Sequence, residues 1–285
     1  MKKQGLEFRV RMGVMPCHLK RRNVRNISKK FFFLFYFFYT LTPIFSLLFL
    51  SGCADLGTYN PATGRKEFIL ISTPEEVQMG TAAHQKILEE NQLSQDPLIL
   101  DRIYRIGQRV ARVSDRKDYT YQFFVIDKDE INAFTTPGGN VYVYTGLLSR
   151  LKTDDQVASV LAHEIGHCAA RHTVKKFQAA LSYSLIGGLI LNQIGEDSSK
   201  VASLASDTVM GIVSSAYSRQ DELEADRLGI KYLNLAGYNI EAMIEVFAIL
   251  REASKWPEVP TMLSTHPHLG ERMEAAKKEI QNYKK

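Results

Sequence analysis

The feature of this chain that most constrains its fold is the pentapeptide His163-Glu164-Ile165-Gly166-His167. Its two histidines are four residues apart, so on an α-helix they share one face and their imidazole rings can bind the same metal ion. Glu164 is rotated by about 100° from His163 and can contact a metal-bound water without being a ligand. The pentapeptide therefore requires a regular helix at this point of the chain.

The residues around the pentapeptide predict that helix. Thr153 and Gln156 form a capping-box pair at its start. Apolar residues continue at three- and four-residue spacing on both sides of the histidines, namely Val157, Val160, Leu161, Ala170 and Val174. The histidines thus lie largely on the apolar face, where an unpaired imidazole loses hydration, so we expect a metal or hydrogen-bond partner. The alternative is a solvated helix that only carries two histidines.

A catalytic zinc needs a third protein ligand and an open position for water. The segment Tyr217–Asp226 begins a second helical pattern, in which Glu222 and Asp226 are four residues apart on one face. Glu222 can bind the metal while Asp226 accepts the spare N–H of a ligand histidine. Two alternatives are Glu224 as the ligand, although the residue four beyond it is Leu228, and Asp226 as the ligand with Glu222 behind it. A helix that only carries surface carboxylates is a further alternative.

Four motifs occur along the chain in a characteristic order. They are Asn132-Ala133-Phe134-x-x-Pro137-Gly138-Gly139, the pentapeptide, Ser218-Arg219-x-x-Glu222-x-Glu224-Ala225-Asp226, and Ser264-Thr265-His266-Pro267. Together they resemble the zinc metallopeptidase family of the HtpX proteases and the CaaX prenyl proteases. After residue 70 the chain is similar to the family's bacterial lipoprotein branch, which is related to outer-membrane assembly proteases. The resemblance implies an α+β, mainly α-helical, zincin-like metalloprotease domain over residues 73–285, with a small β-sheet beside the active-site helix.

The resemblance also implies a role for each motif residue. One Zn²⁺ per chain would be bound by His163, His167 and Glu222. Glu164 would be the general base, taking a proton from the zinc-activated water and passing it to the leaving amine. Asp226 would be a carboxylate beside the ligands, sometimes described as a proton donor. His266 matches a family histidine in a mobile loop that assists or blocks the zinc, and the alternative is a loop histidine with no catalytic part.

These roles predict a zinc-dependent endopeptidase that hydrolyses misfolded or stalled envelope proteins. The alternative is an envelope chaperone or assembly factor with a latched metal site, that is, a site whose open position is occupied by His266. A structural zinc protein is disfavoured, because Glu164 has no task there and structural sites usually employ cysteines. We interpret Cys168 as a small packing residue and His172 as a surface or core histidine.

Two segments before the pentapeptide are rich in strand-forming residues, Tyr121–Ile126 and Val141–Thr145, and the turn-forming cluster Thr136–Asn140 precedes the second. We expect both strands beside the active-site helix, where an exposed edge pairs with an extended peptide. The alternative is an ordinary structural hairpin. Further helices are expected from Thr73 and over residues 100–113, 240–250 and 269–283. The apolar stretches 181–194 and 201–213 predict a helical hairpin that covers the active site or lies on the bilayer surface.

The N-terminal segment predicts export and lipidation. Basic residues between Lys20 and Lys30 precede an apolar run over residues 31–50, which ends in the lipobox-like tetrad Leu50-Ser51-Gly52-Cys53. We expect residues 1–52 to be a lipoprotein signal peptide, Cys53 to carry the lipid, and residues 53–72 to be a tether leading into the domain. An uncleaved membrane anchor is the alternative. Ala54 favours a periplasm-facing outer-membrane location over the inner membrane.

The charge balance changes when this leader is set aside. Residues 53–285 hold 26 basic and 30 acidic residues, a formal net charge of −4, and no basic patch that would indicate nucleic acid. With Cys53 acylated, Cys168 has no partner for a disulfide. We also expect the chain to lack the helical-repeat domain of some relatives.

Overall fold

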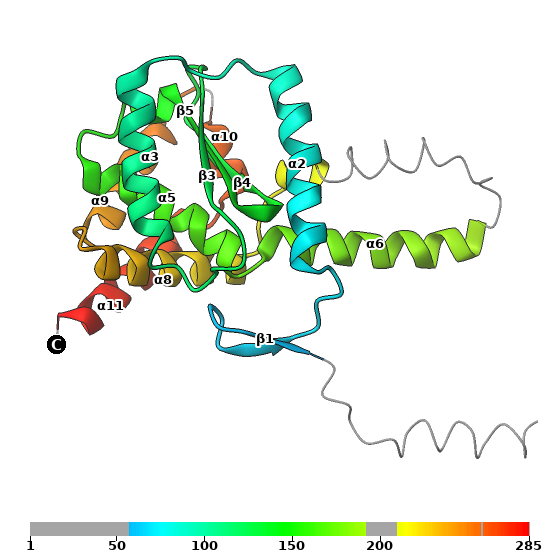
Figure 1. Ribbon diagram of the computed structural model, residues 1–285. Coiled ribbons are helices and arrows are strands. Elements are labelled where there is room, and N and C mark those ends of the chain that lie inside the picture. Colours follow the sequence, from blue (N-terminus) through cyan, green and yellow to red (C-terminus); the bar gives the residue numbers. More distant parts are fainter. Residues whose placement is uncertain (1–56, 192–209, 258, 285) are drawn as a thin grey trace, which may run out of the picture. The chain divides into compact units, whose positions relative to one another are not determined.

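Helices form most of the structure, and a three-stranded sheet lies among them (Figure 1). The computed structural model describes residues 57–191, 210–257 and 259–284. These belong to one unit that begins at Gly57. The predicted signal peptide over residues 1–52 and the predicted lipidation site Cys53 lie outside the described residues.

The helices are bounded as follows. They are α2 (Thr73–Glu90), α3 (Pro97–Ala111), α4 (Thr145–Leu148), α5 (Asp154–Ala169), α6 (His172–Leu191), α8 (Arg219–Ala236), α9 (Ala242–Ala253), α10 (Thr261–Thr265) and α11 (Leu269–Tyr283). The helices expected around the pentapeptide, from Thr73, and over residues 100–113, 240–250 and 269–283 are present as α5, α2, α3, α9 and α11, and the last matches its expected bounds. The expected α+β, mainly helical fold is confirmed.

The sheet contains both predicted strands and one that the sequence analysis missed. It consists of β3 (Gln122–Ile126), β5 (Asn140–Tyr144) and β4 (Ala133–Thr136), in the order β3-β5-β4. The two predicted strands do not form a hairpin with each other, because β3 and β5 are parallel. The antiparallel partner of β5 is β4, and the short helix η1 (Pro137–Gly139) connects the two. Gly138 and Gly139 have φ values of 77° and 87°, which this tight connection requires.

The start and end of α5 differ from expectation in two details. The Thr153 hydroxyl accepts a hydrogen bond from the Gln156 backbone N–H, at 3.2 Å, as a capping residue should. The Gln156 side chain does not complete a capping box, because its Oε1 accepts from the backbone N–H of Lys152 instead. The helix also ends earlier than the apolar periodicity indicated. Arg171, with φ of 58°, breaks it, so Val174 lies on α6.

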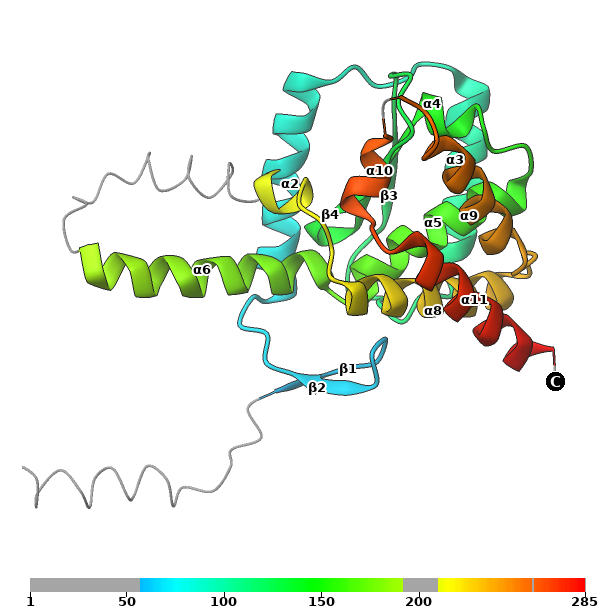
Figure 2. The same ribbon diagram turned by 180° about the vertical axis from the view of Figure 1, so that it is seen from behind.

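Helices α5 and α8 pack closely together, and two glycines make this approach possible. A Cβ on Gly166 would lie 2.8 Å from the carbonyl oxygen of Ala225, well inside van der Waals contact. A Cβ on Gly229 would lie 3.3 Å from the backbone nitrogen of His163. The close packing brings the pentapeptide on α5 opposite Glu222 on α8. Figure 2 shows α11 beside α8, and the two helices are in contact.

A two-stranded hairpin occupies much of the segment predicted to be a tether. Strand β1 (Thr58–Asn60) pairs antiparallel with β2 (Arg65–Glu67). The Asn60 amide donates to the carbonyl of Ala169 at the end of α5, and Lys175 on α6 forms an ion pair with Glu67 at 2.6 Å. The hairpin is therefore fastened to the junction of α5 and α6.

The apolar stretches expected to form a helical hairpin are described only in part. Helix α6 covers the first to Leu191, and residues 192–209 lie outside the described residues. Ile212 and Val213 are buried against Phe177 of α6 and Ala83 of α2. Across the described ranges, no helix combines the length and hydropathy that crossing a membrane requires.

Candidate metal centre

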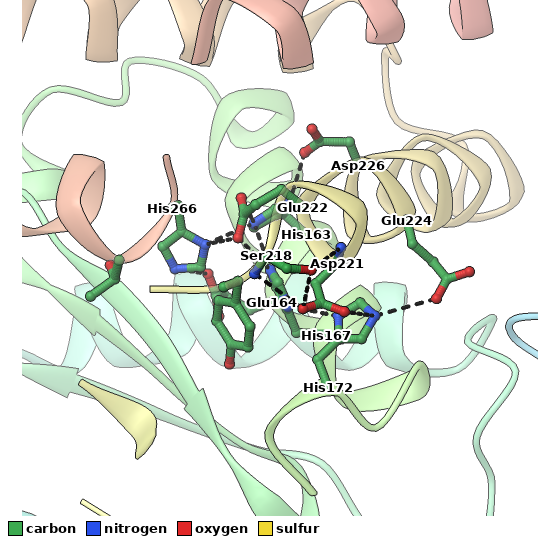
Figure 3. Close-up of polar contacts among 12 residues, drawn as sticks. His163, Glu164, His167, His172, Ser218, Asp221, Glu222, Glu224, Asp226 and His266 are labelled. Atoms are coloured by element: carbon green, nitrogen blue, oxygen red, sulfur yellow. Dashed lines mark hydrogen bonds and ion pairs between the residues drawn. The ribbon is translucent and has the colours of Figure 1, made fainter. Parts of the chain in front are cut away.

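Three elements contribute to one buried cluster of side chains (Figure 3). His163 and His167 come from α5, Glu222 comes from the first turn of α8, and His266 directly follows α10. Each is at most 3% exposed. One ligand atom from each of the four lies within 4.8 Å of all the others. The structure thus brings together residues that are up to 103 positions apart in the chain.

The spacing of these atoms fits a tetrahedral zinc ion. The Nε2 atoms of His163 and His167 are 3.1 Å apart, and His266 Nδ1 lies 3.2 Å from the first of them. Glu222 approaches His167 to 3.4 Å, and His266 to 3.0 Å. Four ligands at about 2.0–2.1 Å from zinc stand about 3.3–3.4 Å from one another, and these four donor distances are close to that separation.

The surroundings of His167 and Glu222 favour the protonation states in which these two side chains bind a metal. Burial lowers the pKa of His167 well below its ordinary value, so the imidazole is neutral. Burial opposes ionisation of Glu222, but the positive charges of His266 and Arg272 outweigh it and hold the Glu222 pKa well below its usual range. A neutral imidazole and an ionised carboxylate are the ligand forms that zinc requires.

Glu164 is fully buried, and neither of its carboxylate oxygens has a hydrogen-bond partner among the described residues. Its nearest charged neighbour is His266, whose Nε2 is 3.7 Å from Glu164 Oε1, too far for a hydrogen bond. That His266 nitrogen is also without a partner there. Burial raises the pKa of Glu164. Unpaired buried polar atoms are costly, and their presence beside the donor cluster indicates that a metal and its water complete this site.

Asp226 lies behind His163, as the four-residue spacing on α8 indicated. Its Oδ1 is 2.9 Å from Nδ1 of His163, so it accepts the spare ring N–H while Nε2 faces the donor cluster. The alternative in which Asp226 is the ligand and Glu222 stands behind it does not match this arrangement. The catalytic and ligand roles of these residues remain predictions.

Glu224, the other candidate ligand, lies outside the donor cluster. It points away from Glu222, toward His172 (Figure 3), and its Oε2 is 3.3 Å from Nε2 of that histidine. The cause is the rotation of about 200° between residues two apart on a helix. Cys168 also lies outside the cluster. Its sulfur is 2.7 Å from the Thr135 hydroxyl, and burial raises the thiol pKa to about 12.

Sequence reasoning missed Arg272, which is 2% exposed beside the cluster. It donates to both oxygens of Asp226, at 2.7 and 2.8 Å, and its Nη1 lies 2.5 Å from Glu222. One feature of the sequence could have indicated this role of Arg272. Arg272 stands within the stripe of buried residues on α11, which includes Met273, Ala276 and Ile280. A charge in such a stripe indicates a buried partner.

Tyr217 is a second residue whose part was not predicted. Its ring stacks on that of His167, with centroids 3.9 Å apart and an interplanar angle of 27°. Its hydroxyl contacts Thr173 of α6 at 2.9 Å. Tyr217 therefore covers one face of the His167 ring and limits its rotation.

The helical fold, the small sheet beside α5 and the buried donor cluster define a zincin-like metallopeptidase domain. The model of Peptidase family M48 matches residues 99–280, more than half of the chain, and the chain belongs to this family. The predicted family is confirmed. Metallopeptidases of this family use zinc, so the predicted cofactor, one zinc ion, is confirmed as well.

Three relatives illustrate the similarity. The beta-barrel assembly-enhancing protease of Escherichia coli (strain K12) is 31% identical over 223 residues, which cover 75% of this chain and 45% of that protein. The protein of the same name from Yersinia pestis is 30% identical over 232 residues, covering 78% and 46%. Mitochondrial metalloendopeptidase OMA1 of Saccharomyces cerevisiae is 30% identical over 235 residues, covering 75% and 66%. The chain thus spans about half the length of these bacterial relatives.

Proposed function

We propose that this protein is a zinc-dependent endopeptidase in which His163, His167 and Glu222 bind the metal and Glu164 is the general base. The observation that carries the proposal is the buried Glu164 carboxylate, unpaired among the described residues and placed beside a donor cluster with zinc-like spacing. A structural zinc site would have no use for an unpaired carboxylate at this position.

The bound zinc would polarise the scissile carbonyl and lower the pKa of a water molecule. The raised pKa of Glu164 brings its proton affinity closer to that of a base working near neutral pH. Glu164 would take a proton at a carboxylate oxygen and then deliver it to the leaving amine. Asp226 would keep the Nδ1 proton of His163 in place, so that Nε2 presents a lone pair.

We propose that an extended substrate pairs with the outer edge of strand β4. Within the described ranges, Ala133–Thr136 pair only with β5, and their other edge has no backbone partner. Strand β4 also contacts α5, so a peptide added there would run past the catalytic helix. Main-chain pairing of this kind tolerates many side chains, which fits a protease with broad sequence preference.

We further propose that the substrates are misfolded or stalled proteins of the bacterial envelope. The name of the Escherichia coli relative refers to beta-barrel assembly. The basic and apolar leader and the lipobox-like tetrad ending in Cys53 support a lipid-anchored protein that faces the periplasm at the outer membrane. The lipid anchor, the outer-membrane location and the envelope substrates are all proposed.

The position of His266 supports a regulated site, and it also favours the second candidate function. A catalytic zinc keeps one position for water, and His266 Nδ1 occupies the place of a fourth donor, 3.2 Å from His163 Nε2 and 3.0 Å from Glu222. In the peptidase, movement of the segment after α10 would free that position. In an envelope chaperone or assembly factor, His266 would stay in place and the site would remain latched.

The experiment that tests this proposal is zinc analysis of the purified full-length protein combined with digestion of casein or an unfolded porin, with and without a chelator. We expect about one zinc per chain and cleavage that stops when the chelator removes the metal. Cleavage that is insensitive to the chelator would contradict the mechanism. Zinc binding without any cleavage, together with full cellular function of a Glu164→Gln protein, would favour the chaperone.

A further inference from the structure

His172, which the sequence analysis set aside as a surface or core histidine, lies directly behind the proposed ligand His167 (Figure 3). The two Nδ1 atoms are 2.9 Å apart, and the ring planes are at 73°. His172 is 1% exposed and His167 is fully buried, so water does not take the place of either partner. At this distance one nitrogen must carry a proton and the other a lone pair, because two equal nitrogens would repel.

The opposite side of the His172 ring faces carboxylates on α8. Glu224 Oε2 lies 3.3 Å from His172 Nε2, and Asp221 Oδ1 lies 3.5 Å away. Asp221 already caps α8, where its other oxygen accepts from the backbone and hydroxyl of Ser218. Glu224 is therefore the acceptor best placed for the His172 N–H.

Glu224 is held in turn from the N-terminal hairpin. Nη2 of Arg65, on β2, is 2.8 and 3.0 Å from the two Glu224 oxygens. Both Glu224 oxygens accept from the Arg65 guanidinium, so the carboxylate is fixed as an acceptor for His172.

Both proposed ligand histidines then have a carboxylate of α8 behind them, by different routes. Asp226 contacts His163 directly, whereas Glu224 reaches His167 through the ring of His172. Glu222, which precedes both of these carboxylates in the chain, faces the donor cluster.

We propose that His172 and Glu224 are positioning residues for the metal, and that Arg65 fixes the outer end of their hydrogen-bonded chain. The proposal rests on His167 being a zinc ligand. The proton order follows from the donor count. Because the Glu224 carboxylate is paired with Arg65 and accepts from His172, Nε2 of His172 carries the proton and its Nδ1 has the lone pair. His167 must then donate from Nδ1, which leaves its Nε2 with the lone pair that a metal needs.

The chain of contacts has a consequence for the whole domain. The hairpin β1–β2 is tied to the metal site through Arg65, and not only to the helix junction through Asn60 and Lys175. Loosening the hairpin should therefore weaken zinc binding, even though the Arg65 side chain is 63% exposed and contacts no predicted ligand.

The test compares zinc affinity of full-length variants, measured by competition with a chromophoric chelator, and the absorption spectrum of the Co²⁺-loaded proteins. His172→Phe removes both ring nitrogens, whereas His172→Asn keeps an acceptor near the Nδ1 position. Arg65→Gln releases the outer end. Matched controls are His84→Phe, a partly buried histidine bonded to Tyr142, and Arg105→Gln, a 56% exposed arginine paired with Asp154.

We expect His172→Phe to weaken zinc binding by roughly 10- to 100-fold and to alter the Co²⁺ spectrum, as loss of a partner behind a ligand does. His172→Asn should recover much of that loss, and Arg65→Gln should weaken binding by about 1.5- to 5-fold. The two controls should leave both readouts unchanged. If His172→Phe does not fold by circular dichroism, His172→Asn, Glu224→Gln and Arg65→Gln decide the question.

Unchanged zinc affinity and Co²⁺ spectra in the folded variants would overturn this inference and leave the proposed peptidase intact. An unmodified protein that binds no zinc would overturn both. The two failures are therefore distinguishable from the same titration.

Discussion

Arg272 and Asp226 form a buried bidentate ion pair, with Nη2 and Nε of the guanidinium 2.7 and 2.8 Å from the two carboxylate oxygens. Both side chains are 3% exposed. The same arginine lies 2.5 Å from Glu222. One cation thus compensates two carboxylates that α8 presents to the metal site, and its removal would leave both charges buried.

Replacing Arg272 by methionine should destabilise the zinc-free protein by about 3–5 kcal/mol, the usual cost of leaving buried charges unpaired. Urea unfolding measures the change. The control is Arg219→Met, because Arg219 pairs with Glu271 at 2.7 Å on the surface, where both side chains are about half exposed, and its loss should cost at most about 1 kcal/mol. Equal effects of the two substitutions would contradict the burial argument.

Glu164→Gln should retain one zinc per chain and lose at least about 100-fold in kcat, because the amide cannot accept the proton. Zinc content and casein hydrolysis measure the two quantities. Glu252→Gln, a change in a 65% exposed carboxylate that pairs with Lys255, should leave both unchanged. Substantial residual activity in Glu164→Gln would require a different general base.

His266→Ala should increase hydrolysis of a short peptide while zinc content stays the same. If the latched state outnumbers the open one by about ten to one, freeing the metal position raises the apparent affinity for substrate by roughly tenfold. The measurement is kcat/KM on a peptide that fits the β4 edge. A large loss of activity would instead mean that His266 assists the reaction, the other role that the family resemblance allows.

A substrate peptide with N-methylated backbone amides at alternate positions should be cleaved much more slowly than the unmodified peptide. The reason is that N-methyl groups remove the donors that would pair with the free edge of β4. Two peptides are compared, one methylated at the odd and one at the even positions. Only one of these two sets of amides faces the strand, so only one of the two peptides should be cleaved slowly. Equal cleavage of all three peptides would exclude main-chain pairing as the mode of binding.

Cys168 should resist alkylation in the folded protein. Burial raises the pKa of its thiol to about 12, so the protonated form persists and about one molecule in a thousand is thiolate at pH 9. Iodoacetamide labelling of the Cys168 peptide, followed by mass spectrometry, should be at least about 100-fold slower in the native protein than in urea. Rapid native labelling would show that the residue is not the packing group we infer.

Much of the metal site could be predicted because helical spacing fixes which side chains share a face. The four-residue spacing predicted that His163 and His167 share one face of a helix and that Glu222 and Asp226 share one face of another. The structure then added what spacing cannot give, namely the contact between the two helices. That contact depends on Gly166, which lets the backbone of Ala225 approach.

The missed features depend on contacts and local backbone conformations that side-chain spacing does not encode. Strand β4 is only four residues long and ends at the start of the turn-forming cluster, so its strand-forming residues Phe134, Thr135 and Thr136 made too short a pattern to indicate a strand. His172 was considered only as a possible metal ligand and not as the hydrogen-bond partner of a ligand. Arg65, which completes the hydrogen-bonded chain through His172 and Glu224, is 159 residues from Glu224. Val174 was expected on the same helix as the pentapeptide. The left-handed backbone of Arg171 ends the apolar periodicity of α5, so Val174 lies on α6 instead.

A crystal structure of the zinc-loaded protein, with anomalous data on both sides of the zinc absorption edge, tests the central claim most directly. We predict one zinc peak bonded at about 2.0–2.2 Å to His163 Nε2, His167 Nε2 and a Glu222 oxygen, with Glu164 near the remaining position. A peak held by other residues, or no peak between α5 and α8 at saturating zinc, would contradict it.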